Sequence, residues 1–262
     1  MDLGLTGKVA LVVAASKGLG RGCALALARE GAHVAICARS EADLAAAAAD
    51  IRAATGAQVL AVPGSVASAA DIHAVAAATA DRFGGIDILV NNSGGPRIGS
   101  FPDVTDDDWQ QAFELVTLNF VHFVREVVPY MRARQWGRII GIQSSSVKQP
   151  VRGIDLSNGL RPGIAGLMKA LMPDLAKDGI TINLVLPGIF LTSRISPGLD
   201  ESGPPDPDLL ARLKPLAETI PAGRLGEPIE LGDLVAFLAS QRAGYITGAT
   251  YQIDGGIIAS NV

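Results

Sequence analysis

The sequence predicts an α/β protein built around a doubly wound parallel sheet. Short runs rich in Val, Ile and Leu alternate with longer helical segments along most of the chain. The runs are too continuously apolar for strands with one face in water, so helices are expected to cover both faces of the sheet. With 48% hydrophobic residues among 262, the chain has enough apolar material for the large core that this arrangement needs.

Seven apolar runs are the predicted strands, at residues 8–13, 33–37, 58–62, 87–90, 138–142, 181–186 and 250–254. Five segments between them have a helical pattern, at residues 19–30, 41–54, 70–83, 106–134 and 162–177. Three aspartates at 106–108 before Trp109 suit the first turn of the fourth helix. The alternation continues without an interdomain linker before residue 190, so we expect a single domain over residues 1–262.

One stretch departs from this alternation. Residues 196–207 read SPGLDESGPPDP, a composition typical of a long loop. Loops of this length in compact enzymes are often functional. We therefore expect residues 193–213 to form a lid that carries the substrate specificity.

Charge and composition exclude several classes of function. The formal net charge is −4 and no basic run is present, which argues against a nucleic-acid partner or an anionic membrane surface. The two cysteines, Cys23 and Cys37, form no motif with the three histidines, so neither a disulfide scaffold nor a metal site is expected. The first residues lack a signal-peptide pattern and no run approaches about 18 apolar residues, so the expected location is the cytoplasm.

A glycine-rich turn follows the first predicted strand and precedes a helix. It contains Ser16, Lys17, Gly18, Leu19 and Gly20. In this position a turn can place a pyrophosphate against the N–H groups at the start of the helix. The alternative is a tight strand-to-helix turn that binds nothing.

The end of the second strand indicates which dinucleotide would bind. Arg39 stands there, where an Asp or Glu would be expected to bind both hydroxyls of an adenosine ribose. Arg39 and Lys17 can bind a 2′-phosphate through charge-assisted hydrogen bonds. The sequence therefore predicts NADP(H), unless the two residues are only solvated surface cations.

Further motifs occur in order along the chain. They are Asn91-Asn92-Ser93-Gly94, Asn119, Gly137-Arg138-Ile139-Ile140 leading to Ser144, Pro187-Gly188, Ile246-Thr247-Gly248 and Asp254-Gly255-Gly256. With the glycine turn, they make the chain resemble the short-chain dehydrogenase/reductase family, and 3-oxoacyl-ACP reductases within it, from about residue 5 to 256. The resemblance implies a single Rossmann-like domain with a seven-stranded parallel sheet, a nicotinamide cofactor and a homotetramer.

The resemblance also implies site residues. The family's catalytic Asn and Ser correspond to Asn119 and Ser144, whereas its Tyr and Lys are replaced by Ser157 and Arg161. No tyrosine lies between Tyr130 and Tyr245, so a shift in register cannot restore it. The implied cofactor-binding residues are Ser16, Lys17, Gly18, Leu19, Gly20, Arg39, Ser65, Val66, Asn91, Ser93, Gly94, Arg161, Pro187, Gly188 and Thr192. The chain departs from the family pattern at Val13, Ala14 and Ser65, where Thr, Gly and Asp are usual.

The loss of the tyrosine removes the family's proton donor and leaves three interpretations open. NADPH-dependent reduction of a carbonyl in a 3-oxoacyl or keto-acid substrate can continue with another donor, of which Lys148, Asp155 and His122 are nearest in sequence. Hydride can instead go to a conjugated C=C bond, since solvent can protonate the resulting enolate. The third interpretation is an NADP(H)-binding sensor or scaffold protein without turnover.

Several cations follow the predicted strand ends although the protein is acidic overall. They are Arg97, Lys148, Arg152 and Arg194, together with Arg161. This bias favours a small anionic substrate, because guanidinium groups bind carboxylates and phosphates well. The alternative is a scatter of loop cations without a shared target.

Overall fold

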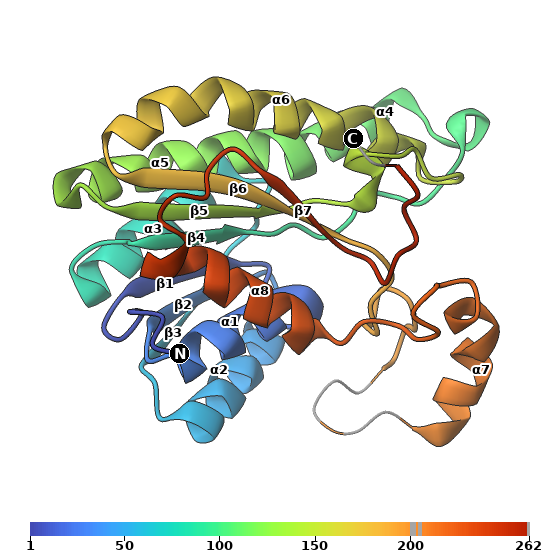
Figure 1. The fold of residues 1–262 in the computed structure, drawn as a ribbon, viewed down its shortest axis with the longest axis horizontal. Coiled ribbons are helices and arrows are strands. Elements are labelled where there is room, and N and C mark those ends of the chain that lie inside the picture. The colour runs from blue at the N-terminus through green and yellow to red at the C-terminus, as the bar shows by residue number, and fades with distance from the viewer. Residues whose placement is uncertain (200–202, 204–205, 261–262) are drawn as a thin grey trace.

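A computed structural model describes residues 1–199, 203 and 206–260. Seven parallel strands form one sheet in the order β3-β2-β1-β4-β5-β6-β7 (Figure 1). This order reverses direction between β1 and β4, as expected for a doubly wound fold. The strands are β1 Val9–Val13, β2 His33–Ala38, β3 Val59–Pro63, β4 Ile88–Asn91, β5 Gly137–Ile142, β6 Ile180–Pro187 and β7 Thr250–Ile253.

Helices cover both faces of the sheet, and alternate residues of each strand contact opposite layers. In β1, Ala10 and Val12 face the layer of α1 Gly18–Arg29, α2 Glu41–Thr55 and α8 Pro228–Ala239. Leu11 and Val13 face the layer of α3 Ala69–Phe83, α5 Asn119–Arg134 and α6 Asp155–Lys177. Figure 1 shows these two layers on either side of the strands. The predicted fold class is therefore confirmed, with both faces of the sheet buried.

The predicted helix 106–134 is not one regular helix. It consists of α4 Asp106–Phe113, a π-helical turn Glu114–Leu118 and then α5. The acidic start is confirmed, since Thr105 and Asp108 form a reciprocal capping box. The π turn ends immediately before Asn119, so it determines where that side chain lies.

The helix predicted at 162–177 begins seven residues earlier, at Asp155. The prediction placed Pro162 at the first helical position, but Pro162 lies inside α6. The preceding loop is tied to the first turn of α6, because the side chain of Asn158 bonds both the N–H and the carbonyl of Val151, at 3.0 and 2.7 Å. This contact extends the helix to include Ser157 and Arg161.

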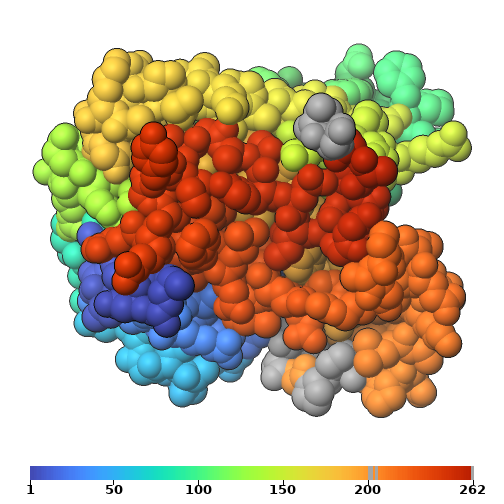
Figure 2. Space-filling view, in the orientation of Figure 1, coloured from blue at the N-terminus to red at the C-terminus, as the bar shows by residue number. Residues whose placement is uncertain are grey.

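The predicted lid at 193–213 is only partly a loop. Residues 200–202, 204 and 205 lie outside the described part of the chain. The predicted loop, residues 196–207, gives way to α7 Pro207–Ala217, which is capped by the side chain of Asp206, so the last part of the predicted lid is helical. Helix α8 was also not predicted. Figure 2 shows α7, in orange, at one end of this face, with the red C-terminal segment spread across its centre.

Three short 3-10 helices complete the described elements: η1 Phe101–Asp103, η3 Ser145–Val147 and η4 Gln241–Ala243. Among the described residues, no helix is long and apolar enough to cross a membrane.

Candidate active site

The glycine-rich turn lies at the point where the order of strands reverses. Gly18 has a φ of 57°, a conformation that glycine adopts without strain. Gly20, in the first turn of α1, lies so close to the residue after β1 that a methyl group there would overlap the backbone of Ala14. Ala14 itself has a φ of 51°, in the left-handed region where glycine is usual. The backbone therefore keeps the form of a phosphate-binding turn despite the alanine.

A pocket of about 660 Å³ opens beside this turn. It is lined by Ala14, Ser16, Lys17, Ala38, Arg39, Ser40, Asp43, Ser65, Val66, Ala67, Gly94, Gly95 and Leu115. These residues lie at or just after the ends of β1, β2, β3 and β4, except for Asp43 in the first turn of α2 and Leu115 in the π turn. A pocket at the carboxyl edge of a parallel sheet, at its switch point, is where dinucleotides bind in doubly wound folds. The turn and the pocket together fit the predicted cofactor.

The charges at the end of β2 differ in part from the prediction. Arg39 is exposed and contacts no charged group in the described part of the chain. Lys17 instead forms a 2.9 Å ion pair with Asp43, which the sequence analysis did not single out. Asp43 lies in the first turn of α2, after the N-cap Ser40, where a carboxylate is common in any helix, so its place in the sequence does not mark it as a site residue. Of the two predicted phosphate ligands, Arg39 is available and Lys17 is already paired.

A buried polar bridge joins three segments at the floor of the site. Asn119 accepts a 2.6 Å hydrogen bond from the side chain of Asn91 and donates a 3.1 Å bond to the carbonyl of Val66. Asn91 and Asn119 are 2% and 1% exposed. Because buried amides are costly unless bonded, this bridge holds the ends of β3 and β4 to the start of α5. Asn119 is thus a positioning residue in this structure.

The predicted Ser157 and Arg161 contact each other on α6. Arg161 Nε donates a 2.9 Å hydrogen bond to Ser157 Oγ, and Nη1 donates a 3.1 Å bond to Gln143 Oε1. Nη1 also lies 3.5 Å from the carbonyl oxygen of Ile142. Ser144 directly follows Gln143, so both serines lie near the same end of β5. Gln143 is a site residue that the sequence analysis missed, since nothing in its type or spacing distinguishes it.

Arg161 is 5% exposed, and burial is the main reason that the pKa of its guanidinium falls to about 10, below its ordinary value. The positive charge of Arg194 lowers it further. Arg161 therefore stays protonated at neutral pH, but its charged form is less stable here than in water. Ser144 is partly exposed, and its Oγ accepts a 3.1 Å bond from the N–H of Ser146. Its hydroxyl hydrogen is free for another acceptor.

The three alternative proton donors lie in different surroundings. Asp155 accepts a 2.8 Å bond from the N–H of Phe101, and Lys148 donates a 3.1 Å bond to Gln252 on β7. His122 lies one turn after Asn119 on α5, partly buried, and makes no hydrogen bond to a described residue. The contact of Asp155 joins α6 to η1 and that of Lys148 joins the end of η3 to β7, so neither is presented as a free acid.

The predicted substrate cations do not form one group. Arg97 pairs with Asp108 at 2.7 Å and also bonds the carbonyl of Asp103, so it supports the start of α4. Arg152 is exposed and has no bonding partner among the described residues. Arg194 alone reaches across the site, to the loop after β4.

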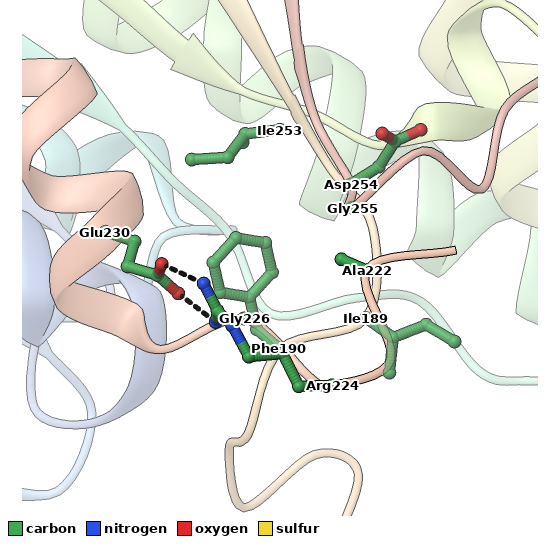
Figure 3. A pocket seen from close by; sticks show the side chains of 9 residues that line it. All are labelled: Ile189, Phe190, Ala222, Arg224, Gly226, Glu230, Ile253, Asp254 and Gly255. Carbon is green, nitrogen blue, oxygen red and sulfur yellow. Dashed lines mark hydrogen bonds and ion pairs between the residues drawn. The ribbon is translucent and has the colours of Figure 1, made fainter. Parts of the chain in front are cut away.

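Pro187 ends β6, and the segment after it carries Gly188 and Thr192. Backbone bonds of 2.8 and 3.0 Å fasten it at Gly226, beside the ring of Phe190. Gly226 is followed by the start of α8, which Arg224 and Glu230 reinforce with a two-bond ion pair of 2.8 and 2.6 Å (Figure 3). This pair lines a small pocket of about 200 Å³ behind the segment. The segment is therefore held firmly up to the point where the predicted lid begins.

Comparisons with known proteins agree with this geometry. A family model described as "Enoyl-(Acyl carrier protein) reductase" matches residues 13–258. Oxidoreductase UcpA of Salmonella typhimurium is 35% identical over 253 residues, which cover 96% of this chain and 95% of the relative. The 3-oxoacyl-[acyl-carrier-protein] reductase FabG of Vibrio cholerae is 35% identical over 264 residues, covering 97% and 99%.

A solved structure shows the same agreement in three dimensions. The L-sorbose reductase of Gluconobacter frateurii, determined in complex with NADPH and L-sorbose, superposes with a TM-score of 0.90 at 33% identity. The match covers 99% of this chain and all of that chain. The chain belongs to the short-chain dehydrogenase/reductase family of oxidoreductases.

Proposed function

We propose that this protein is an NADPH-dependent reductase that works without the family's tyrosine and lysine. Its acceptor is a carbonyl, as in a 3-oxoacyl or keto-acid substrate, or a conjugated enone. The observation that carries the proposal is the hydrogen-bonded row of Ser157, Arg161 and Gln143 beside Ser144, at the carboxyl edge next to the dinucleotide pocket. The NADPH complex of the sorbose reductase supports the choice of cofactor.

The cofactor would lie along the glycine turn, near Arg39 and over Asn91 and Gly94, and when bound it supplies the hydride. Ser144 donates a hydrogen bond to the oxygen on which negative charge develops. One such donor, held in place beforehand, contributes about 3 kcal/mol to lowering the barrier. Arg161 adds a fixed positive charge to the same end of β5 and holds the oxygen of Ser157 by its 2.9 Å bond, which leaves the hydroxyl hydrogen of Ser157 free to donate.

Ser157 does not replace the tyrosine as an acid, because an aliphatic hydroxyl is a much weaker acid than a phenol. Two hydroxyls and one guanidinium can stabilise an oxyanion or enolate, and water can then supply the proton. This division of roles suits a conjugated C=C acceptor in particular, since the enolate is protonated at carbon after the hydride has been transferred. A carbonyl acceptor requires a water molecule that reaches the alkoxide.

The test is NADPH oxidation with a panel of β-keto thioesters, keto acids and enones, using wild type and Ser144→Ala. We expect turnover by the wild type and a fall in kcat of about 100- to 1000-fold in the variant. Ser260→Ala, a serine change near the C-terminus, is the matched control. Tight NADPH binding without turnover of any acceptor would contradict the proposal and favour a sensor or scaffold.

The assembly is a proposal from the family, and the location is a proposal from the sequence. We propose a homotetramer that works in the cytoplasm on a small molecule. A surface groove of about 550 Å³ between α5 and α6 supports self-association, since Val121, Val124, Leu167 and Leu171 are among its lining residues. Light scattering during size-exclusion chromatography tests this, and a monomer at micromolar concentration would contradict it.

A further inference from the structure

Two arginines reach the same edge of the sheet from different segments. Arg161 projects from α6 to the end of β5, where Nη1 meets Gln143. Arg194 follows β6, and its Nη1 and Nη2 donate to the carbonyl oxygens of Gly95 and Pro96 at 3.2 and 3.0 Å. Gly95 and Pro96 come just after β4, which is the neighbour of β5 in the sheet. Two guanidinium groups therefore gather over the ends of adjacent strands, beside the proposed catalytic serines.

Neither of these positive charges has a negative partner in the part of the chain that the structure describes. Arg161 bonds a hydroxyl, an amide oxygen and a carbonyl, and Arg194 bonds two carbonyls. Burial, and then the repulsion from Arg194, lower the pKa of Arg161 to about 10. Arg194 is exposed, but Arg161 is buried, and proteins usually pair a buried charge because an uncompensated one is costly. An anion bound at this edge would supply the missing charge.

Both side chains also keep unused donors. Nη2 of Arg161 and Nε of Arg194 make no hydrogen bond to any residue in the described ranges. A guanidinium group matches the two oxygens of a carboxylate, which is a stronger acceptor than the neutral carbonyls that Arg194 now contacts. Gly95 allows this approach, since a methyl group there would overlap the guanidinium of Arg194.

We propose that Arg161 and Arg194 together bind a carboxylate of the substrate, so that the site prefers oxo acids or unsaturated acids to their neutral counterparts. This inference rests on the reductase activity proposed above, because it names the substrate class of the same site. It also reduces the set of cations that the sequence predicted to bind an anionic substrate, because that set included Arg97 and Lys148. Those two side chains are bonded to Asp108 and Gln252 instead.

The phosphates of the cofactor are the other anions that reach this edge of the sheet. The turn that would hold the pyrophosphate follows β1, whereas Arg161 lies at the end of β5 with Ser144 and Ser157. Position therefore favours an anion on the substrate. The experiment below separates the two sources by measuring the affinity for NADPH in the same variants.

The test compares acetoacetate with methyl acetoacetate, which present the same ketone with and without a free carboxylate. Binding of each to the protein saturated with NADP⁺ is measured by titration calorimetry, and NADPH oxidation is measured in parallel. The variants are Arg194→Gln, which removes the charge, and Arg194→Lys, which keeps it without the planar fork. Arg29→Gln is the matched control, because it removes an exposed arginine in the last turn of α1.

We expect the wild type to bind the acid at least 10-fold more tightly than the ester. Arg194→Gln should abolish this preference, Arg194→Lys should keep part of it, and Arg29→Gln should leave it unchanged. Equal binding of acid and ester by the wild type, including no detectable binding of either, would overturn the proposal. So would a preference that survives Arg194→Gln.

An equal loss of NADPH and acid affinity in Arg194→Gln would assign Arg194 to the cofactor and also overturn the proposal. The two proposals fail in distinguishable ways. Selective binding of the acid without NADPH oxidation by any acceptor would refute the reductase but support the carboxylate site. Oxidation of NADPH at equal rates with the acid and the ester would support the reductase but refute the carboxylate site.

Discussion

Replacing Arg161 by Met tests whether its charge is uncompensated in the folded protein. Burial, and then the repulsion from Arg194, lower the pKa of Arg161 to about 10, which corresponds to a penalty of roughly 3 kcal/mol on the charged form. At pH 7 the guanidinium is charged in both the folded and the unfolded chain, so the substitution removes this penalty. It also removes the hydrogen bonds to Ser157 and Gln143, at about 1.5 kcal/mol or more each. The two effects nearly cancel.

We therefore expect Arg161→Met to change the free energy of unfolding by no more than about 2 kcal/mol, although a buried, hydrogen-bonded residue is lost. Urea unfolding followed by circular dichroism, at matched protein concentration, measures this. Arg138→Met is the control, because burial lowers the pKa of Arg138 to about 10 as well, so a similar penalty is removed, while bonds to three carbonyls and a stack on Trp136 at 4.3 Å are lost. Arg138→Met should therefore lower the free energy of unfolding by more than Arg161→Met does.

A loss of about 4 kcal/mol or more in Arg161→Met would refute the reasoning, since a loss of that size is typical of breaking a compensated buried ion pair. The same titration repeated with acetoacetate adds a second check. A carboxylate that binds the folded protein at ten times its Kd should stabilise the wild type by about 1.4 kcal/mol and leave the variant unchanged.

Two further substitutions test other parts of the site. Arg39→Asp should shift cofactor preference from NADPH towards NADH by about 10-fold or more, because a carboxylate repels the 2′-phosphate and can bind ribose hydroxyls. The Kd values of both cofactors are measured by NAD(P)H fluorescence, and unchanged values would show that Arg39 does not bind the phosphate. Asn119→Ala should lower the free energy of unfolding by about 3 kcal/mol, because it leaves the side chain of Asn91 and the carbonyl of Val66 without partners. A loss below about 1 kcal/mol in urea unfolding would show that water replaces the bridge.

The sheet could be predicted closely because parallel strands buried on both faces are apolar at every position. The predicted strands lie within two residues of the observed ones at both ends. Helix boundaries were less predictable where tertiary contacts decide them. The start of α6 depends on the contact between Asn158 and Val151, and neither residue type nor periodicity reveals it.

The site was predictable only where it matches the family pattern. Ser157 and Arg161 were found by their places in that pattern, and their four-residue spacing on a helix makes their contact reasonable. Arg194 and Gly95 are 99 residues apart in sequence, so only the fold shows that they touch. Asp43 escaped notice because a carboxylate after an N-cap is commonplace.

The most direct test of the reductase is to follow the hydride itself. The protein would be incubated with NADPH that carries deuterium at both C4 positions of the nicotinamide and with the best acceptor of the panel, and the product mass measured. The proposed activity predicts one deuterium in each molecule of reduced product, and a much smaller amount of that product with Ser144→Ala. An unlabelled product, or no reduced product from any acceptor although NADPH binds, would contradict it.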